Sequence, residues 1–467
     1  MTRKSQFIII VLGREGVILR LGGYRLYVSI KKSNIKTVQQ PTTANEDLAL
    51  MRPTSCSVNT QHAKKRNSSI ELLRIIAMLM IVSHHYVYHN GEFLNNLPPF
   101  SGKEYFFLLI ESMGSIGVML FFAISAWYLC QEKKPSLWKN MRRAWLLERE
   151  VLFYSITLFL IFFIYKRDLF SSRLILSSLF PTATALWWYV TAYVVFLFLE
   201  PSLTVGLRQI GKKMHGCLVL SFMILWAFLS GLSPIPLFGA NIGSFAYFVF
   251  IYTTIAFYRW YMEDLGTRFA VVILIIGVCL ITSSILVLQI CGTLLQSPSL
   301  RAGSTYLTSS IIKLPVLLIG FGSIIIAEKK YFCNRIINLI ASTTFGIYLI
   351  HEYPIIRHYL WNSQYGISEV YNKPLAILVA MGFVLSVFIS CIFLDIVRQG
   401  LFKITVEKNK GMYFNKLSLH ISKYKFISRL RDYLSEESTS DTPKINGDVL
   451  MDQADQPIPP TCPPRHI

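Results

Sequence analysis

The stretch ELLRIIAMLMIVSHHYVYH, residues 71–89, decides the fold class, because it is apolar enough to enter a lipid bilayer and yet carries titratable side chains. Arg74 lies near its start, and His84, His85 and His89 lie near its end. Such groups are unfavourable in hydrocarbon and mark functional positions when they occur in membrane helices. The stretch therefore predicts a membrane helix that carries part of a functional site.

The composition of the whole chain agrees with a membrane protein. Of 467 residues, 53% are hydrophobic and 15% are charged, whereas soluble chains carry about 25% charged residues. Ten apolar segments approach the ~20 residues that a helix needs to cross a bilayer. They are 70–88, 105–129, 146–165, 184–204, 215–233, 244–262, 269–291, 307–327, 334–352 and 374–397. The predicted fold class is all-α, a polytopic membrane protein of about ten transmembrane helices.

The net charge of +20 does not predict binding to nucleic acid, because the positive charges gather in alternate loops between the apolar segments. Examples are residues 64–66, 133–143 and 208–213, whereas the intervening loops hold few lysines and arginines. Cytoplasmic loops of membrane proteins collect these residues. The pattern predicts that both termini are cytosolic and that the number of spans is even.

The chain divides by composition into three parts. Residues 1–69 form a basic cytosolic extension, 70–400 the transmembrane domain, and 401–467 a cytosolic tail. In the tail, residues 415–434 alternate basic and apolar side chains and predict an amphipathic helix on the anionic leaflet. The end of the tail is polar, rich in proline and predicted to be disordered. The eight cysteines include no CxxC pair, so we interpret them as small hydrophobic residues.

Arg74 and His85 are expected on one face of the first helix. They are 11 positions apart, which at 3.6 residues per turn is about three turns and a rise of about 16 Å. His84 points roughly 80° away from that face. One helix face thus presents a cation at its cytosolic end and an acid–base group in its outer half.

Structural explanations of the same residues remain open at this point. Arg74 can extend to the lipid headgroups or pair with Glu71, three positions earlier. His85 can be a buried structural residue, and His89 fits the outer interface. The i,i+4 spacing of His85 and His89 suits a metal ion, but the neighbouring sequence supplies no third ligand, so no metal is expected.

Four stretches, taken in order, resemble the membrane acyltransferases of family 3. The first is IELLRIIAMLMIVSHH, with an Arg-x10-His spacing, and together the four cover about residues 67–400. The others are GSIGVMLFFAISAWYLC (114–130), LWWYVTAYVVFLFLEPSL (186–203) and TFGIYLIHEYP (344–354). The chain departs from the family at Ala126, where glycine is usual, and after the second span, where Arg142, Arg143 and Arg149 occur without a following proline.

The resemblance implies an enzyme of the plasma membrane that crosses it many times. It implies transfer of an acyl group, expected to be acetyl, from cytosolic acetyl-CoA or a related acyl-CoA to a hydroxyl. The implied acceptor is a cell-surface or cell-wall glycan or a lipid-linked sugar. Acyl-CoA is a substrate, and no cofactor is expected.

Transfer to a hydroxyl needs a base, and histidine suits this role because its unperturbed pKa is near 6.5. We assign the base to His85, the orientation of its ring to Glu111 at a similar depth, and contact with the pantetheine arm or the polar end of the donor to Arg74. Glu111 is equally compatible with an interfacial glutamate that only faces water. Arg142 and Arg143 are the candidates for the phosphates of the donor. The loop position alone also explains these two arginines.

The candidate acceptor-binding residues lie at the outer ends of two other spans. They are Trp187, Tyr189, His351 and Glu352. Aromatic rings stack on sugars, but they also form interfacial belts without a ligand. The polar pair at 351–352 is equally compatible with simple exposure at the membrane surface.

Two other function classes account for arginine, histidine and glutamate inside a membrane. One is a transporter or flippase for a polar lipid or saccharide, and the other is a sensor without catalytic activity. Acceptor-dependent consumption of acyl-CoA indicates the enzyme, whereas movement of substrate without a covalent product indicates the transporter.

Overall fold

The computed structural model describes most of the chain, and the chain divides into two compact units, Met1–Ala63 and Lys64–Ile467. The described residues are 9–13, 16–21, 24–29, 67–90, 94, 97–232, 244–361, 370–371, 373–407 and 420. The predicted amphipathic segment and the predicted disordered tail lie outside these residues, apart from 401–407 and His420.

The first unit holds a small antiparallel sheet that the sequence analysis did not predict. Its strands are β1 (Ile9–Gly13), β2 (Gly16–Leu21) and β3 (Tyr24–Ser29), which pair in the order β1-β2-β3. The three runs are rich in β-branched and aromatic residues, which favour strands. The all-α fold class therefore applies to the second unit and not to this extension.

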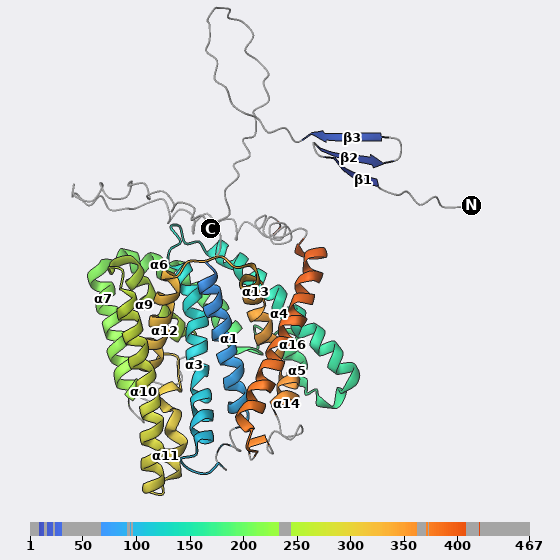
Figure 1. Ribbon diagram of the computed structural model, residues 1–467. Coiled ribbons are helices and arrows are strands. Elements are labelled where there is room, and N and C mark those ends of the chain that lie inside the picture. The colour runs from blue at the N-terminus through green and yellow to red at the C-terminus, as the bar shows by residue number, and fades with distance from the viewer. Residues whose placement is uncertain are drawn as a thin grey trace, which may run out of the picture. The chain divides into compact units, whose positions relative to one another are not determined.

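The described part of the second unit is built from helices (Figure 1). The longer ones are α1 (Ser68–Tyr88), α3 (Gly102–Leu129), α4 (Leu137–Tyr165), α6 (Trp188–Gln209), α7 (Gly211–Phe222), α9 (Ser244–Tyr261), α10 (Thr267–Leu294), α12 (Leu314–Lys329), α13 (Arg335–His351) and α16 (Ala376–Ile404). The shorter ones are η1 (Arg167–Leu169), α5 (Ser172–Leu179), η2 (Met223–Leu229), α8 (Ser230–Leu232), α11 (Pro298–Ala302), η3 (Gly303–Thr308) and α14 (Pro354–Trp361).

Each of the ten predicted segments overlaps one of the longer helices. Within the described residues, six helices are long and apolar enough to cross a membrane, judged by length and composition. They are α1, α3, α6, α7 continued by η2, α10 and α16. Helices α12 and α13 have only 16 and 17 residues, which is short of the ~20 that span a bilayer.

The largest difference from a predicted boundary lies at the start of α4. Helix α4 begins at Leu137 and not near 146, so Arg142 and Arg143 lie on its first turns and not in a loop. The segment between Pro135 and the apolar run contains no glycine or proline. Helix-favouring residues therefore continue the helix beyond the part that hydropathy detects.

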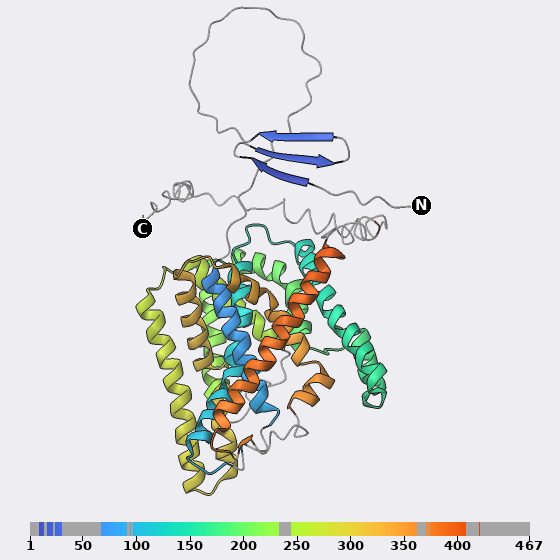
Figure 2. The same cartoon turned by 45° about the vertical axis from the view of Figure 1, so that its right-hand side comes forward.

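Helices α1 and α3 pack closely together, as Figure 2 also shows. A Cβ atom at Gly117 would lie only 2.6 Å from the carbonyl oxygen of Ala77, so glycine is needed for this approach of the two backbones. A Cβ atom at Gly114 would overlap the ring of His84. The glycines of the second span thus fix the distance between the two helices.

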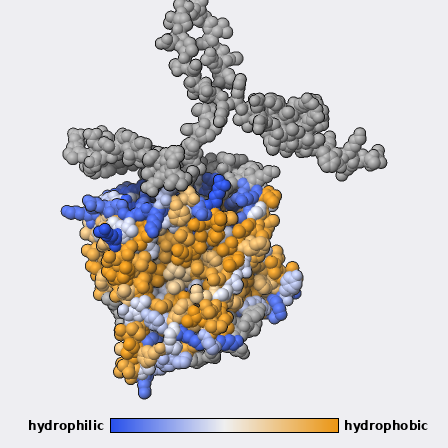
Figure 3. Space-filling model, in the orientation of Figure 1, coloured by the Kyte–Doolittle hydropathy of each residue, from blue (hydrophilic) through white to orange (hydrophobic). Residues whose placement is uncertain are grey.

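The outer surface of the bundle is apolar. Figure 3 shows one face, on which hydrophobic residues form a band between two rims of hydrophilic residues. Large apolar side chains on α10 and α16 are more than half exposed, among them Val287 at 53% and Phe393 at 67%. Because water would disfavour so much exposed apolar surface, the band is the face that contacts lipid. The protein is therefore an α-helical membrane protein.

Helix α13 contacts both α1 and α16, and a buried ionic cluster ties α16 to α4. In this cluster, the Tyr154 hydroxyl donates to Asp395 Oδ1 over 2.6 Å. Arg398 donates from Nε to the same Asp395 oxygen over 2.7 Å and lies 3.1 Å from Glu150. Asp395 is fully buried and Arg398 almost so.

Candidate functional site

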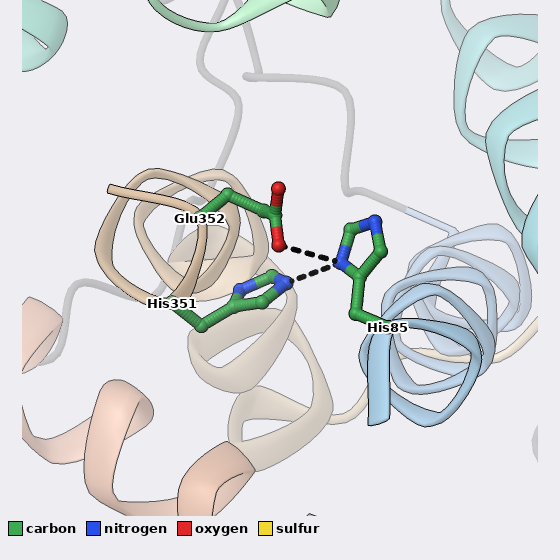
Figure 4. A group of neighbouring side chains, drawn as sticks. All are labelled: His85, His351 and Glu352. Carbon is green, nitrogen blue, oxygen red and sulfur yellow. Dashed lines mark hydrogen bonds and ion pairs between the residues drawn. The ribbon is translucent and has the colours of Figure 1, made fainter. Parts of the chain in front are cut away.

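Helices α1 and α13 bring three titratable side chains together, and we call them the histidine cluster: His85, His351 and Glu352 (Figure 4). His85 Nδ1 lies 2.9 Å from His351 Nε2 and 3.2 Å from Glu352 Oε1. His85 belongs to the last turn of α1, His351 ends α13, and Glu352 caps it. Residues 266 positions apart in the sequence thus form one site.

The hydrogen bonds of the cluster determine where the ring protons lie. His351 Nδ1 lies 2.6 Å from the carbonyl oxygen of Ile347. A carbonyl oxygen only accepts, so Nδ1 carries the proton and Nε2 of the neutral ring presents a lone pair. His85 Nδ1 therefore faces two acceptors, the His351 lone pair and the Glu352 carboxylate, and it must be the donor. This leaves His85 Nε2 as the basic nitrogen.

Further contacts hold the Glu352 carboxylate in place. His89 Nε2 lies 3.3 Å from Oε1, and Arg357 donates to Oε2 over 3.5 Å. The Glu352 side chain is only 11% exposed. A carboxylate that is both shielded from water and held by neighbours can orient a histidine ring.

His84 faces a different helix. Its Nδ1 lies 2.5 Å from the backbone carbonyl oxygen of Glu111 on α3, and its ring stacks on Tyr88. The neighbouring histidines of α1 thus point to different partners, as the helical geometry predicts. The predicted partner Glu111 meets His84 through its backbone, whereas the carboxylate beside His85 is that of Glu352.

A small cavity of about 30 Å³ opens beside His85, enough for two or three water molecules by a rough comparison with ~10–15 Å³ for each. Its wall is mainly apolar and aromatic, and it is lined by Met78, Ile81, His85, Val118, Phe121, Trp188, Tyr189 and Tyr348. The predicted residue Tyr189 is part of this wall. Trp187 is buried against Tyr353, and its neighbour Trp188 lines the cavity.

A row of tyrosines leads from the cavity toward Arg74. The Tyr189 ring stacks on Tyr193 with 6.1 Å between centroids, and the Tyr193 hydroxyl bonds Ser125. Arg74 and Arg143 both act electrostatically on the Tyr193 hydroxyl. Arg74 also forms the predicted ion pair with Glu71 over 2.9 Å, with its side chain 25% exposed.

Cationic side chains gather where α3 ends and α4 begins, which we call the basic end. A second, open cavity of about 510 Å³ lies here, lined by Cys130, Gln131, Lys133, Arg208, Arg259, Trp260 and Tyr261. Arg208 connects α6 to the segment after α3 in the wall of this cavity, because it donates to the backbone carbonyls of Lys133 and Glu132 over 3.0 and 2.7 Å. The buried Nε of Arg259 has no hydrogen-bond partner among the described residues.

The two predicted donor-binding arginines differ in their surroundings. Arg143 donates to Glu132 Oε2 over 2.9 Å and to Asn140 Oδ1, whereas Arg142 is exposed. Burial raises the pKa of Glu132, but hydrogen bonds from Arg143 and Lys139 outweigh this and lower the pKa overall. Glu132 is therefore ionised at neutral pH and keeps Arg143 in one orientation.

Sequence reasoning chose Trp187 instead of Trp188 and did not assign Arg208 and Arg259 to a site. A pair of adjacent tryptophans at the start of a helix gives no sign of which one points inward. The two arginines were attributed to the charge of the loops, and only the convergence of α6, α9 and the α3–α4 connection makes them neighbours.

Comparison with known proteins identifies the family. The family model of the acyltransferase domain of family 3 matches residues 67–395, which includes the histidine cluster, both cavities and most of α16. No curated protein matches the chain, and no solved structure matches it. The matched region is well over half of the chain and agrees with the four stretches that carry the resemblance. The chain belongs to acyltransferase family 3 and is a membrane acyltransferase.

Proposed function

We propose that this protein is an O-acyltransferase of the plasma membrane that uses a cytosolic acyl-CoA, with acetyl as the expected acyl group. The acceptor is a hydroxyl of a cell-surface or cell-wall glycan or of a lipid-linked sugar. The observation that carries the proposal is the arrangement around His85. Its Nδ1 is held as a donor between His351 and Glu352, so Nε2 is free to act as a base beside the cavity that it lines.

The reaction is a direct acyl transfer. His85 Nε2 removes the proton of the acceptor hydroxyl while the oxygen attacks the thioester carbonyl. The new C–O bond forms, the C–S bond breaks, and the proton passes from His85 to the thiolate that leaves. Glu352 stabilises the imidazolium that exists between these proton transfers, as a carboxylate does in other histidine-based sites.

The donor is proposed to enter at the basic end. The open cavity beside Lys133, Arg208 and Arg259 is positively charged and large enough for phosphate groups. Farther along the proposed path of the donor lie Arg143, which forms an ion pair with Glu132, and Arg74, beside the row of tyrosines. Arg74 and His85 are separated by a rise of about 16 Å along α1, so an extended arm is needed to bring the acyl group from one to the other.

The acceptor is proposed to meet the donor at the cavity beside His85. Trp188 and Tyr189 provide aromatic surface there, and rings of this kind bind the apolar faces of sugars. In this proposal His351 and Glu352 position the base instead of binding the acceptor, and Trp187 supports the wall from behind.

The proposed topology has ten spans with both termini in the cytosol. The excess of lysine and arginine at the basic end supports this orientation. Six helices satisfy the criteria of length and hydropathy for a span. In this proposal α4, α9, α12 and α13 are the other four spans. The histidine cluster then lies toward the outer face, where glycans are accessible.

The test compares two neighbouring histidines in membrane vesicles of cells that make the protein, with labelled acetyl-CoA as donor and the native acceptors present. His85→Ala should lower acetyl transfer per inserted protein by roughly 10²–10⁴-fold. His84→Ala should have a smaller effect, because that ring bonds the Glu111 backbone.

Near-normal transfer by His85→Ala would reject His85 as the base. Movement of a lipid or saccharide without a new acyl ester would favour the transporter. Mass spectrometry of surface glycans from cells with and without the gene identifies the acceptor.

A further inference from the structure

We infer that His85, His351 and Glu352 form a binding site for a divalent ion of the zinc type, and that an ion bound there inhibits the enzyme. The inhibition, but not the binding, rests on the proposed role of His85 as the base. Sequence analysis expected no metal because the first span supplies no third ligand. Helix α13 supplies two.

The distances within the cluster fit a small ion. Zinc binds nitrogen and oxygen at about 2.0–2.2 Å, so a tetrahedral site holds neighbouring ligand atoms about 3.4 Å apart. His85 Nδ1 lies 2.9 Å from His351 Nε2 and 3.2 Å from Glu352 Oε1. All three ligand atoms lie within 4.8 Å of one another. For the two pairs that involve His85, shifts of a few tenths of an ångström, on the order of side-chain motion, would complete the geometry, and the pair His351–Glu352 needs a shift of about 1.4 Å at most.

The chemistry of the donors also fits. Two imidazoles and one carboxylate form a known set of three protein ligands for zinc, with a fourth position left for water. His351 is fully buried, and the side chains of His85 and Glu352 are 16% and 11% exposed. The carboxylate supplies one negative charge in a shielded position, which attracts a cation although Arg357 on its other oxygen offsets part of it.

The surrounding contacts prepare the ligand atoms. The Ile347 carbonyl fixes the proton of His351 on Nδ1, so that the Nε2 lone pair is directed at the cluster. This is the type of outer contact that orients zinc-binding histidines. Arg357 bonds Glu352 through Oε2, whereas Oε1 faces both His85 Nδ1 and His89 Nε2 and is the ligand atom on the side of His85.

Metal binding and base catalysis require opposite tautomers of His85. The base has its proton on Nδ1 and its lone pair on Nε2. An ion on Nδ1 displaces that proton, and the neutral ring then carries its proton on Nε2. A ring in this state cannot remove a proton from the acceptor hydroxyl. Zinc therefore competes with catalysis by occupying the nitrogen that must stay protonated.

The binding test uses no acyl substrate, so its result is independent of the proposed reaction. The purified full chain in detergent is stripped of metal with a chelator and titrated with Zn²⁺ against a chromogenic chelator. Co²⁺ serves as a second probe, because its visible spectrum reports tetrahedral coordination. We expect one ion per chain, with affinity lowered in His351→Ala by more than the ~10–100-fold that loss of an outer contact causes.

The control for binding is His358→Ala, which removes an exposed histidine of α14 outside the cluster. It should leave the affinity unchanged. Absence of stoichiometric binding by the unaltered chain, or equal loss in the His351 and His358 variants, would overturn the site.

The inhibition test measures acetyl transfer in the same vesicles as above. Added Zn²⁺ should lower transfer by at least about tenfold at saturation, and excess chelator should restore it. Binding without inhibition, or a requirement for Zn²⁺ in transfer, would overturn the inhibitory role. Loss of transfer in His85→Ala without any zinc binding would retain the proposed function and reject this inference alone.

Discussion

The substitution Glu352→Gln tests the central feature of the site, which is the carboxylate beside His85. Glutamine keeps the size of the side chain and an oxygen that can accept a hydrogen bond from His85 Nδ1–H. It removes the negative charge. In the proposed reaction, the imidazolium of His85 then loses its neighbouring anion. The matched control is Glu111→Gln, because Glu111 is the carboxylate that the sequence alone assigns to His85.

The expected magnitude follows from the geometry. A hydrogen bond to a charged group contributes about 1.5–3 kcal/mol, and each 1.36 kcal/mol changes a rate about tenfold. The contact between His85 Nδ1 and Glu352 Oε1 is 3.2 Å, at the long end for such bonds. The lower half of the range therefore applies. We expect kcat to fall roughly 10–45-fold in Glu352→Gln, with KM for the donor changed by less than about threefold.

The assay is acetyl transfer in membrane vesicles at several acetyl-CoA concentrations, normalised to inserted protein. Glu352→Ala should be more damaging than Glu352→Gln, because it also removes the acceptor oxygen. Glu111→Gln should stay within about threefold of the unaltered chain. Normal activity of Glu352→Gln together with a large loss in Glu111→Gln would refute the assignment and restore the sequence-based one.

Two further predictions concern the donor and the packing of the second span. Arg143→Ala should raise KM for acetyl-CoA about 10-fold or more and Arg142→Ala less than about threefold, because Glu132 orients only the first of these arginines. Equal effects on KM would contradict this distinction. Gly114→Ala should lower stability in detergent by about 1–3 kcal/mol, measured by thermal unfolding, because the new Cβ overlaps the His84 ring. Gly102→Ala, with nothing within 4 Å of its Cβ, is the control, and equal destabilisation by both would exclude the clash as the cause.

The sequence predicts the helices of the second unit because long apolar runs are a local property. It fails at the start of α4, where charged residues continue a helix that hydropathy does not detect. It also misses the three strands of the first unit, which lie in short runs within a segment that is otherwise polar. Pairing of strands depends on contacts between separate short segments. Composition taken over a longer window does not detect segments of five or six residues.

The sequence predicts the candidate site only for residues that lie on the same helix. Helical geometry separates His85 from His84, and in the structure the two rings bond different helices. Which carboxylate meets His85 depends on the contact of α1 with α13. Glu111 and Glu352 are both compatible with the expected depth, and no spacing within α1 distinguishes them. The same reason explains why Trp187 and Trp188 could not be told apart.

The ionic cluster of α16 has a consequence for how the protein is assembled in the membrane. Asp395 and Arg398 bond each other one turn apart on the same helix, so this segment can enter the bilayer as an electrically neutral unit. The direct partners of Glu150 and Tyr154, Arg398 and Asp395, both belong to α16, which arrives near the end of synthesis. A chain that stops before residue 395 would therefore leave a glutamate on α4 without its cation.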